Sequence, residues 1–138
     1  MPDATPSAAM SPGAYLRRRR LAAGLELVDI ALVTTASPID AYGRGEWLRL
    51  IEEDRTPITA DVVETLLFAF PLDRHSLNKL ILIHAGARID PPRLCAGCAC
   101  SAFDPCRGTD GSSCAWVGDT DLCTTCAAAP LAAGRIAA

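Results

Sequence analysis

The chain has 138 residues, half of them hydrophobic, and a formal net charge of −3. This length is sufficient for one modest hydrophobic core and a small additional module. No run of 18 apolar residues could span a bilayer, and no basic segment followed by an apolar stretch marks the N-terminus for export. We therefore expect a cytoplasmic protein with no membrane insertion.

The charges are unevenly distributed. Residues 1–24 carry four arginines and one aspartate, whereas residues 25–90 carry six basic and eleven acidic side chains. Because sequence-independent DNA affinity comes from basic side chains that neutralise phosphates, this acidic body favours DNA binding only if its arginines share one face. The four consecutive arginines at 17–20 span a full helical turn, so we expect some of them to pair with neighbouring carboxylates. The acidic candidates are Glu26, Asp29, Glu52 and Glu53.

The N-terminal part is predicted to be entirely helical after a disordered leader, residues 1–10, which is rich in Pro, Ala and Ser. Ser11 followed by Pro12 is a typical helix start and Gly24 a typical stop, which predicts a first helix over residues 12–23. A second helix is predicted over residues 27–33, where apolar residues recur on one face.

The next predicted helix is interrupted early. The pair Ser37-Pro38 repeats the start signal, but two glycines within residues 43–45 follow, so only about one helical turn is expected here. The apolar spacing resumes over residues 46–54 and predicts another helix there. The connection from the preceding full helix would then extend over residues 34–45.

Two further helices complete the domain. Thr59 caps one of them, and Asp73 begins another that Gly86 closes. The helices therefore form one mainly α domain of five helices over residues 11–86. Residues 87–94, which contain a pair of prolines, are predicted to form a semi-rigid linker.

Two segments of this domain carry a family resemblance. The sequence YLRRRRLAAGLELVDIA, residues 15–31, resembles the opening of the Xre/Cro helix-turn-helix family of phage-type repressors, in which a basic first helix and a glycine precede a helix with an alanine packed at the turn. The sequence WLRLIEEDRTP, residues 47–57, resembles the recognition helix of that family and the turn after it. The resemblance covers residues 12–86.

The resemblance implies double-stranded DNA as a partner, with residues 27–33 as the supporting helix and residues 46–53 as the reading helix. In the family, the N-terminal part of the reading helix enters the major groove, where Arg can fork onto guanine and Glu can accept from cytosine. Trp47 is expected to pack in the helical core. The implied base or phosphate contacts are Arg44, Glu46 and Arg49, and the implied DNA-backbone contacts are Arg17, Arg18 and Arg20.

Seven cysteines lie within residues 95–126, and none precedes them. They begin with one Cys-x-x-Cys pair and end with a second, after an intervening loop of 24 residues. Two such pairs supply the four thiolates of a closed tetrahedral zinc site. The predicted ligands of this structural Zn²⁺ are Cys95, Cys98, Cys123 and Cys126.

The remaining cysteines, Cys100, Cys106 and Cys114, leave three alternatives open. They could form a second site with a non-cysteine ligand, share a bridging thiolate with the first site, or be small buried side chains. The predicted number of zinc ions is therefore one or two. An iron–sulfur cluster and a disulfide framework are the rival interpretations of the cysteines. His75 and His84 are expected on ordinary helix faces.

The apolar side chains between the two pairs are too few to form a core. They are Phe103, Trp116, Val117 and Leu122. We therefore expect metal binding and folding to be coupled in an irregular zinc module, with Trp116 packed under the cysteine pairs. The module resembles a small cysteine-rich segment of phage and prophage proteins, and the alanine-rich residues 127–138 follow it as a low-complexity tail.

These patterns favour a DNA-binding transcriptional regulator of phage or prophage type, in which the zinc module makes a protein contact or a second DNA contact. The alternative is a non-catalytic adaptor that binds a host protein such as the transcription machinery. An enzyme is not expected, because a closed thiolate shell leaves no position for substrate and the sequence has no phosphate-binding glycine loop. A homodimer is expected. The helix face considered for it, if exposed, is Leu77, Leu80, Ile81 and His84.

Overall fold

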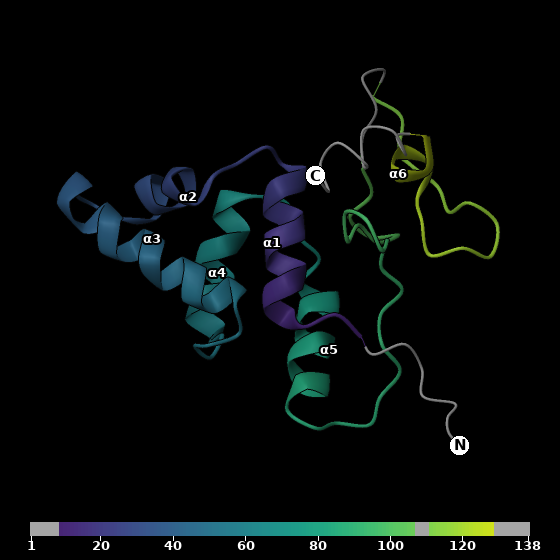
Figure 1. The fold of residues 1–138 in the computed structure, drawn as a ribbon, viewed down its shortest axis with the longest axis horizontal. Coiled ribbons are helices and arrows are strands. Elements are labelled where there is room, and N and C mark those ends of the chain that lie inside the picture. Colours follow the sequence, from purple (N-terminus) through teal and green to yellow (C-terminus); the bar gives the residue numbers. More distant parts are fainter. Residues whose placement is uncertain (1–8, 107–110, 129–138) are drawn as a thin grey trace. The chain divides into compact units, whose positions relative to one another are not determined.

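The computed structural model describes residues 9–106 and 111–128, and divides the chain into two compact units, Met1–Pro92 and Arg93–Ala138 (Figure 1). The division falls within the predicted linker, residues 87–94. Most of the predicted leader and nearly all of the predicted alanine-rich tail lie outside the described residues. The two units are treated separately below.

The described residues form six helices and no extended sheet, which confirms the prediction of a mainly α chain. Isolated β-bridges join Ser101 to Asp104 and Trp116 to Cys123. The helical unit contains α1 Pro12–Ala22, α2 Leu27–Thr34, α3 Pro38–Glu52, α4 Ala60–Ala69 and α5 Arg74–His84, and the cysteine unit contains the short α6 Thr124–Ala128.

Local capping determines where four of these helices begin. In each, a side-chain oxygen of the residue before the helix accepts a hydrogen bond from a backbone N–H of the first turn, which would otherwise lack a partner. Two of the helices also have proline at their first position, as the sequence predicts. The four capping residues are Ser11, Ser37, Thr59 and Asp73.

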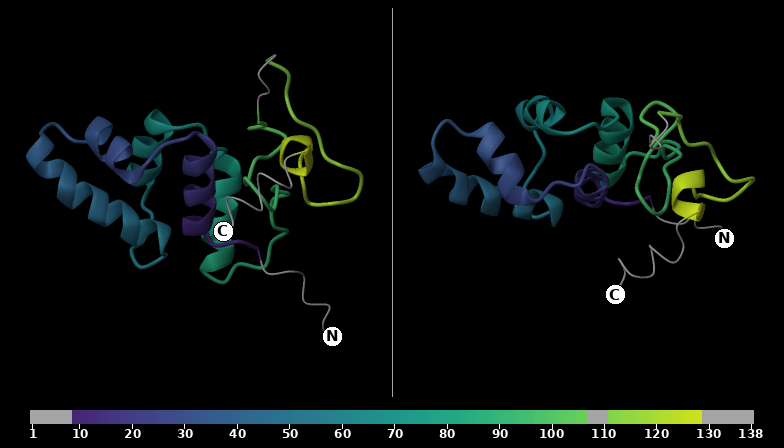
Figure 2. Two further views of the ribbon diagram at one scale, coloured as in Figure 1. Left: turned by 45° about the horizontal axis from the view of Figure 1, so that its top comes forward. Right: turned by 90° about the horizontal axis from the view of Figure 1, so that it is seen from above.

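The predicted interruption at residues 43–45 was wrong, because α3 is continuous from Pro38 to Glu52. The connection from α2 to α3 is consequently only residues 35–37, and not residues 34–45. Each glycine costs about 1 kcal/mol of helix propensity, but packing offsets this cost. A Cβ at Gly45 would lie 4.0 Å from the Cβ of Ala31, which is fully buried in α2, so small residues occupy this crossing. The two helices lie side by side (Figure 2).

The core of the helical unit is apolar. Helix α1 contacts both α3 and α5, and α2 contacts both α3 and α4. Tyr15 is fully buried in α1, and its hydroxyl accepts the backbone N–H of Asp73, just before α5, at 2.7 Å. The largest side chains fully buried in this unit are Tyr15, Leu16, Ile30, Ile51, Leu77 and Leu80.

One ion pair is buried between α1 and α3. Arg20 donates from Nε and Nη2 to the two carboxylate oxygens of Glu52 at 2.7 and 2.9 Å, and from Nη1 to the carbonyl of Leu25 at 2.8 Å. The hydrogen bonds with Glu52 raise the pKa of Arg20, which therefore stays charged. The structure thus confirms that one of the four arginines pairs with a predicted carboxylate.

Candidate functional site

The two Cys-x-x-Cys pairs come together in the cysteine unit. The sulfur atoms of Cys95, Cys98, Cys123 and Cys126 all lie within 4.8 Å of one another, so this group could hold a metal ion. These are the four cysteines that the spacing predicts. Cys95 and Cys123 are buried, whereas Cys98 and Cys126 are half-buried. The donor set of four thiolates fits a closed tetrahedral site for a soft divalent ion such as zinc.

Backbone amides point toward the sulfur atoms of this group. The N–H groups of Gly97 and Cys123 donate to Sγ of Cys95 at 3.3 and 3.4 Å, and the N–H of Cys126 donates to Sγ of Cys123 at 3.4 Å. Such donors favour the thiolate over the thiol, which is the form that binds metal. The local fold of each pair therefore prepares its sulfur atoms to be ligands.

Hydrogen bonds and burial shift the pKa values of the cluster's thiols in opposite directions. Burial raises the pKa of Cys95 and of Cys123, but hydrogen bonds from backbone amides and from neighbouring thiols together outweigh it and lower both values, that of Cys123 to about 6. At Cys98 and Cys126 burial prevails and raises the pKa. Before metal binds, the buried pair of sulfurs therefore carries more thiolate character than the half-buried pair.

The first pair also depends on a close approach at Gly97. A Cβ at this position would lie 2.8 Å from Sγ of Cys126 and 3.7 Å from Sγ of Cys95. No larger residue fits there without displacing a sulfur atom. Next to it, the N–H of Ala96 donates to the carbonyl of Asp121 at 2.6 Å, which holds the first pair beside the loop that leads to the second.

The three remaining cysteines belong to the same cluster. A second group of sulfur atoms within 4.8 Å of one another consists of Cys98, Cys100, Cys106 and Cys123. Cys114 lies next to this group, with its Sγ 3.7 Å from Sγ of Cys100, and it accepts the N–H of Cys106 at 3.2 Å. Cys100 is buried in this cluster, and Cys106 and Cys114 are half-buried against it.

All seven cysteines are free in the structure, and none is joined in a disulfide. The sulfur atoms of Cys98 and Cys106 lie 3.3 Å apart, well beyond a disulfide bond of about 2.05 Å. His75 and His84 lie on α5 of the helical unit, are exposed, and belong to neither cysteine group.

Trp116 packs against the cysteine cluster, as the sequence predicts. The guanidinium of Arg93 stacks over its ring at 4.0 Å from the centroid, and donates to the carbonyl of Thr120 at 2.9 Å. Phe103, by contrast, is 82% exposed. The apolar support of the cluster is therefore even smaller than the composition of the segment indicates.

The helical unit offers a second candidate site, the outer stripe of α3. Ile39 and Tyr42 are 88% and 80% exposed, although both are large and apolar or aromatic. Two turns after Tyr42, the guanidinium of Arg49 is held between Glu46 at 2.8 Å and Glu53 at 3.1 Å. Sequence reasoning missed Ile39 and Tyr42 because it ended the helix too early. The Ser37-Pro38 start signal alone would have placed them in its first turns.

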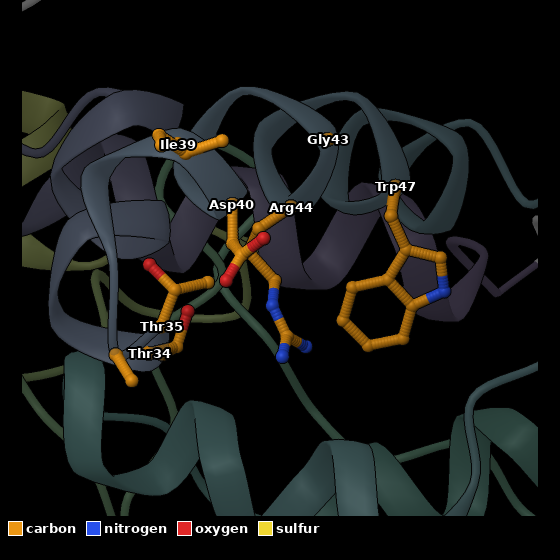
Figure 3. A pocket seen from close by; sticks show the side chains of 8 residues that line it. Thr34, Thr35, Ile39, Asp40, Gly43, Arg44 and Trp47 are labelled. Carbon is orange, nitrogen blue, oxygen red and sulfur yellow. The ribbon is translucent and has the colours of Figure 1, made fainter.

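A shallow pocket borders this stripe where α2 ends and α3 begins (Figure 3). Thr34 and Thr35 line it from α2 and the connection, and Arg44 and Trp47 line it from α3. The guanidinium of Arg44 lies 4.8 Å from the centroid of the Trp47 ring, an attractive cation–π distance. Trp47 is therefore only partly in the core, and one of its faces is turned to this pocket.

The predicted DNA-contacting residues have different surroundings. Arg17 is exposed and Arg18 half-buried on α1, whereas Arg20 is enclosed in its ion pair with Glu52. The α5 face that was considered for a homodimer contact is not exposed as that contact requires. Leu77 and Leu80 are fully buried within the helical unit.

No helix in the described ranges has both the length and the apolar character needed to cross a membrane. Comparison of the chain with protein-family models, with curated protein sequences and with solved structures gives no match.

Proposed function

We propose that the chain is a DNA-binding transcriptional regulator of phage or prophage type whose cysteine unit is ordered by structural zinc. The observation that carries the DNA part is the pairing of α2 with α3 through only residues 35–37. In helix-turn-helix proteins, the second helix of such a pair lies in the major groove and its N-terminal residues contact base edges. Helix α3 is the second helix of the pair in this unit, which supports the proposal.

The exposed stripe of α3 defines how it would read DNA. Because the helix begins at Pro38, Ile39 and Tyr42 lie at the end that enters the groove, where apolar side chains can contact thymine methyl groups. Glu46 and Arg49 follow one and two turns after Tyr42; Glu46 could accept from cytosine, and Arg49 could donate to guanine. Arg44 and the exposed Arg17 are suited to phosphates, and Arg20 is left out because Glu52 already holds it.

The cysteine unit contributes structure to this function. Four thiolates satisfy zinc completely and leave no open position for substrate, so the ion would order the loops and would not react. The same closed donor set supports our proposal that the chain is not an enzyme. Its exposed loops then serve as a surface for a protein partner or for a second contact with DNA.

A specific observation favours a second candidate, a non-catalytic adaptor that binds a host protein. The leading end of α3 exposes Ile39 and Tyr42, and the exposed arginine of the helix, Arg49, is paired with two glutamates. Exposed aromatic and aliphatic side chains are typical anchors of protein interfaces. An adaptor would use Ile39 and Tyr42 as anchors on a protein partner. The net negative charge of the chain would not oppose such binding as it opposes binding to DNA phosphates.

A salt titration of DNA binding distinguishes the two functions. The regulator should bind genomic DNA fragments with a sequence preference, and its affinity should fall steeply as salt rises because counterions are released from the DNA. No binding at about 50 mM salt would contradict the regulator and favour the adaptor.

A matched pair of variants tests the reading helix. Arg49→Ala should weaken specific binding by about 5- to 150-fold if this side chain reads a base. Arg74→Ala removes the same charge from α5, where the arginine pairs with Glu64, and should leave sequence preference unchanged. Equal affinities of the two variants would remove Arg49 from the interface.

A further inference from the structure

The cysteine cluster contains more sulfur than one metal ion can use. One tetrahedral ion is satisfied by four thiolates, yet Cys100, Cys106 and Cys114 lie against the first group of four. Cys100 is 1% exposed and packs in the same buried cluster as Cys95 and Cys123. A second ion would give these three sulfur atoms a ligand role.

The sulfur separations show which cysteines could share an ion. A tetrahedral site with metal–sulfur bonds of about 2.3 Å places its sulfur atoms about 3.8 Å apart. The separations from Cys98 are 3.3 Å to Cys106 and 3.9 Å to Cys123. Cys100 and Cys114 are 3.7 Å apart. The separations of 3.9 and 3.7 Å match one edge of a tetrahedron around a metal ion, and the separation of 3.3 Å is shorter than such an edge.

Cys98 and Cys123 are the two sulfurs that belong to both groups of four. Cys98 is the one whose sulfur lies 3.3 Å from that of Cys106, which is in the second group only. Its edge to Cys123 lies in the first group, and its edge to Cys106 lies in the second. Two four-coordinate ions need eight ligand positions, and seven thiolates fill them if one sulfur is shared. The geometry points to a binuclear thiolate centre in which Cys98 bridges two zinc-type ions, the second ion being completed by Cys100, Cys106 and Cys114.

Cys114 is preferred over Cys123 as the fourth ligand of the second ion. Its sulfur lies one tetrahedral edge from Cys100 and accepts the backbone N–H of Cys106, the same kind of bond that prepares Cys95 in the first site. Cys123 lies in both groups of four, and its sulfur accepts the N–H of Cys126, the other member of its own Cys-x-x-Cys pair, which favours the first site for it. This inference rests on the proposed metal centre and is independent of DNA binding.

Metal stoichiometry of the full chain, measured by elemental analysis and native mass spectrometry after loading with zinc, tests the proposal. Two zinc ions per chain and protection of all seven thiols from alkylation are expected. One zinc ion would overturn the binuclear centre while leaving the proposed single site intact. No zinc, or iron with labile sulfide, would overturn both.

Three single variants then assign the ligands. Cys114→Ser should bind one ion, because only the second site loses a ligand, and Cys126→Ser should bind one ion, because only the first does. Cys98→Ser should bind neither ion tightly, because both sites lose the shared sulfur. Two ions in Cys114→Ser would overturn the assignment of that ligand, and one tightly bound ion in Cys98→Ser would overturn the bridge.

A measurement on the unaltered chain covers the case in which a variant fails to fold. Loaded with an NMR-active cadmium isotope, the protein should give two cadmium signals with scalar coupling to each other, since a shared sulfur connects the ions through two bonds. Two signals without coupling, or a single signal, would contradict the bridge.

Discussion

The two units of this chain are ordered by different means. The helical unit buries large apolar side chains such as Leu16, Ile51 and Leu77, whereas the fully buried side chains of the cysteine unit are mainly thiols. Each large apolar side chain contributes about 1.5–3 kcal/mol when buried, so several suffice for a small helical domain. A structural zinc site supplies on the order of 10 kcal/mol in one step. The helical unit should therefore be stable without metal and the cysteine unit should not.

The largest expected effect is the loss of the first metal site when one of its buried ligands is replaced. Cys95 is fully buried and its sulfur receives two backbone N–H groups, so Cys95→Ser should abolish tight zinc binding at the first site and disorder the two Cys-x-x-Cys pairs. The helical unit should keep its circular dichroism signal. Ala102→Ser introduces the same hydroxyl at an exposed position and should change neither property. Zinc binding by Cys95→Ser equal to that of Ala102→Ser would contradict the claim that metal orders the cysteine unit.

The next largest effect concerns only the helical unit. Arg20→Ala leaves the carboxylate of Glu52 buried without its partner, which should lower the free energy of unfolding of this unit by about 3–5 kcal/mol. Urea denaturation followed by helical signal measures the change, and zinc content should stay constant. Arg17→Ala removes an exposed arginine from the same helix and should cost less than about 0.5 kcal/mol. Equal losses in the two variants would contradict the structural role of the pair.

Gly97→Ala should weaken metal binding without removing a ligand. The added methyl group would lie 2.8 Å from Sγ of Cys126 and must displace it, so zinc affinity should fall by about 10- to 100-fold, as for other residues that position ligands. Competition with a zinc-binding dye measures this affinity. Ala96→Ser alters the exposed neighbour and should bind zinc like the unaltered protein. An unchanged affinity in Gly97→Ala would mean that the pair tolerates a side chain there.

Gly13→Ala tests a close backbone approach in the helical unit, as Gly97→Ala does in the cysteine unit. A Cβ at Gly13 would lie 2.5 Å from the backbone carbonyl oxygens of Ile51 and Glu52, so the start of α1 would move away from the end of α3, at a cost of about 1–3 kcal/mol. Gly43→Ala is the matched control, since nothing lies within 4 Å of its added methyl group and alanine favours the helix by about 1 kcal/mol. Thermal unfolding should therefore shift in opposite directions, and a shift in the same direction would contradict the close packing of α1 on α3.

Local signals predicted most of the helix boundaries correctly. Ser11, Thr59 and Asp73 cap helices that begin where expected, because a capping side chain acts on amides only two or three residues away. The course of α3 was not predictable in this way. Its continuation through Gly43 and Gly45 depends on contact with α2 and α1, which lie elsewhere in the sequence.

In the candidate sites too, features set by neighbouring residues were predictable and features set by distant contacts were not. The four cysteines of the two Cys-x-x-Cys pairs could be assigned from spacing, because each pair places two sulfurs from one short turn. The place of Cys114 beside Cys100 depends on the path of the loop between them, which spacing does not specify. Glu52, the partner of Arg20, was among the expected carboxylates. The exposed Ile39 and Tyr42 were not expected in the reading helix, because its predicted start was residue 46 and the observed start is Pro38.

Hydrogen exchange of the full chain, with zinc bound and after its complete removal by a chelator, tests most directly whether metal orders one unit and apolar burial the other. Removal of zinc should abolish the protection of the amides of Cys95 and Ala99, which donate to Cys100 and Cys95 in the cysteine unit. The amide of Leu77, which donates to Asp73 in the helical unit, should remain as protected as before. Persistent protection of Cys95 and Ala99 in verified metal-free protein would contradict the account.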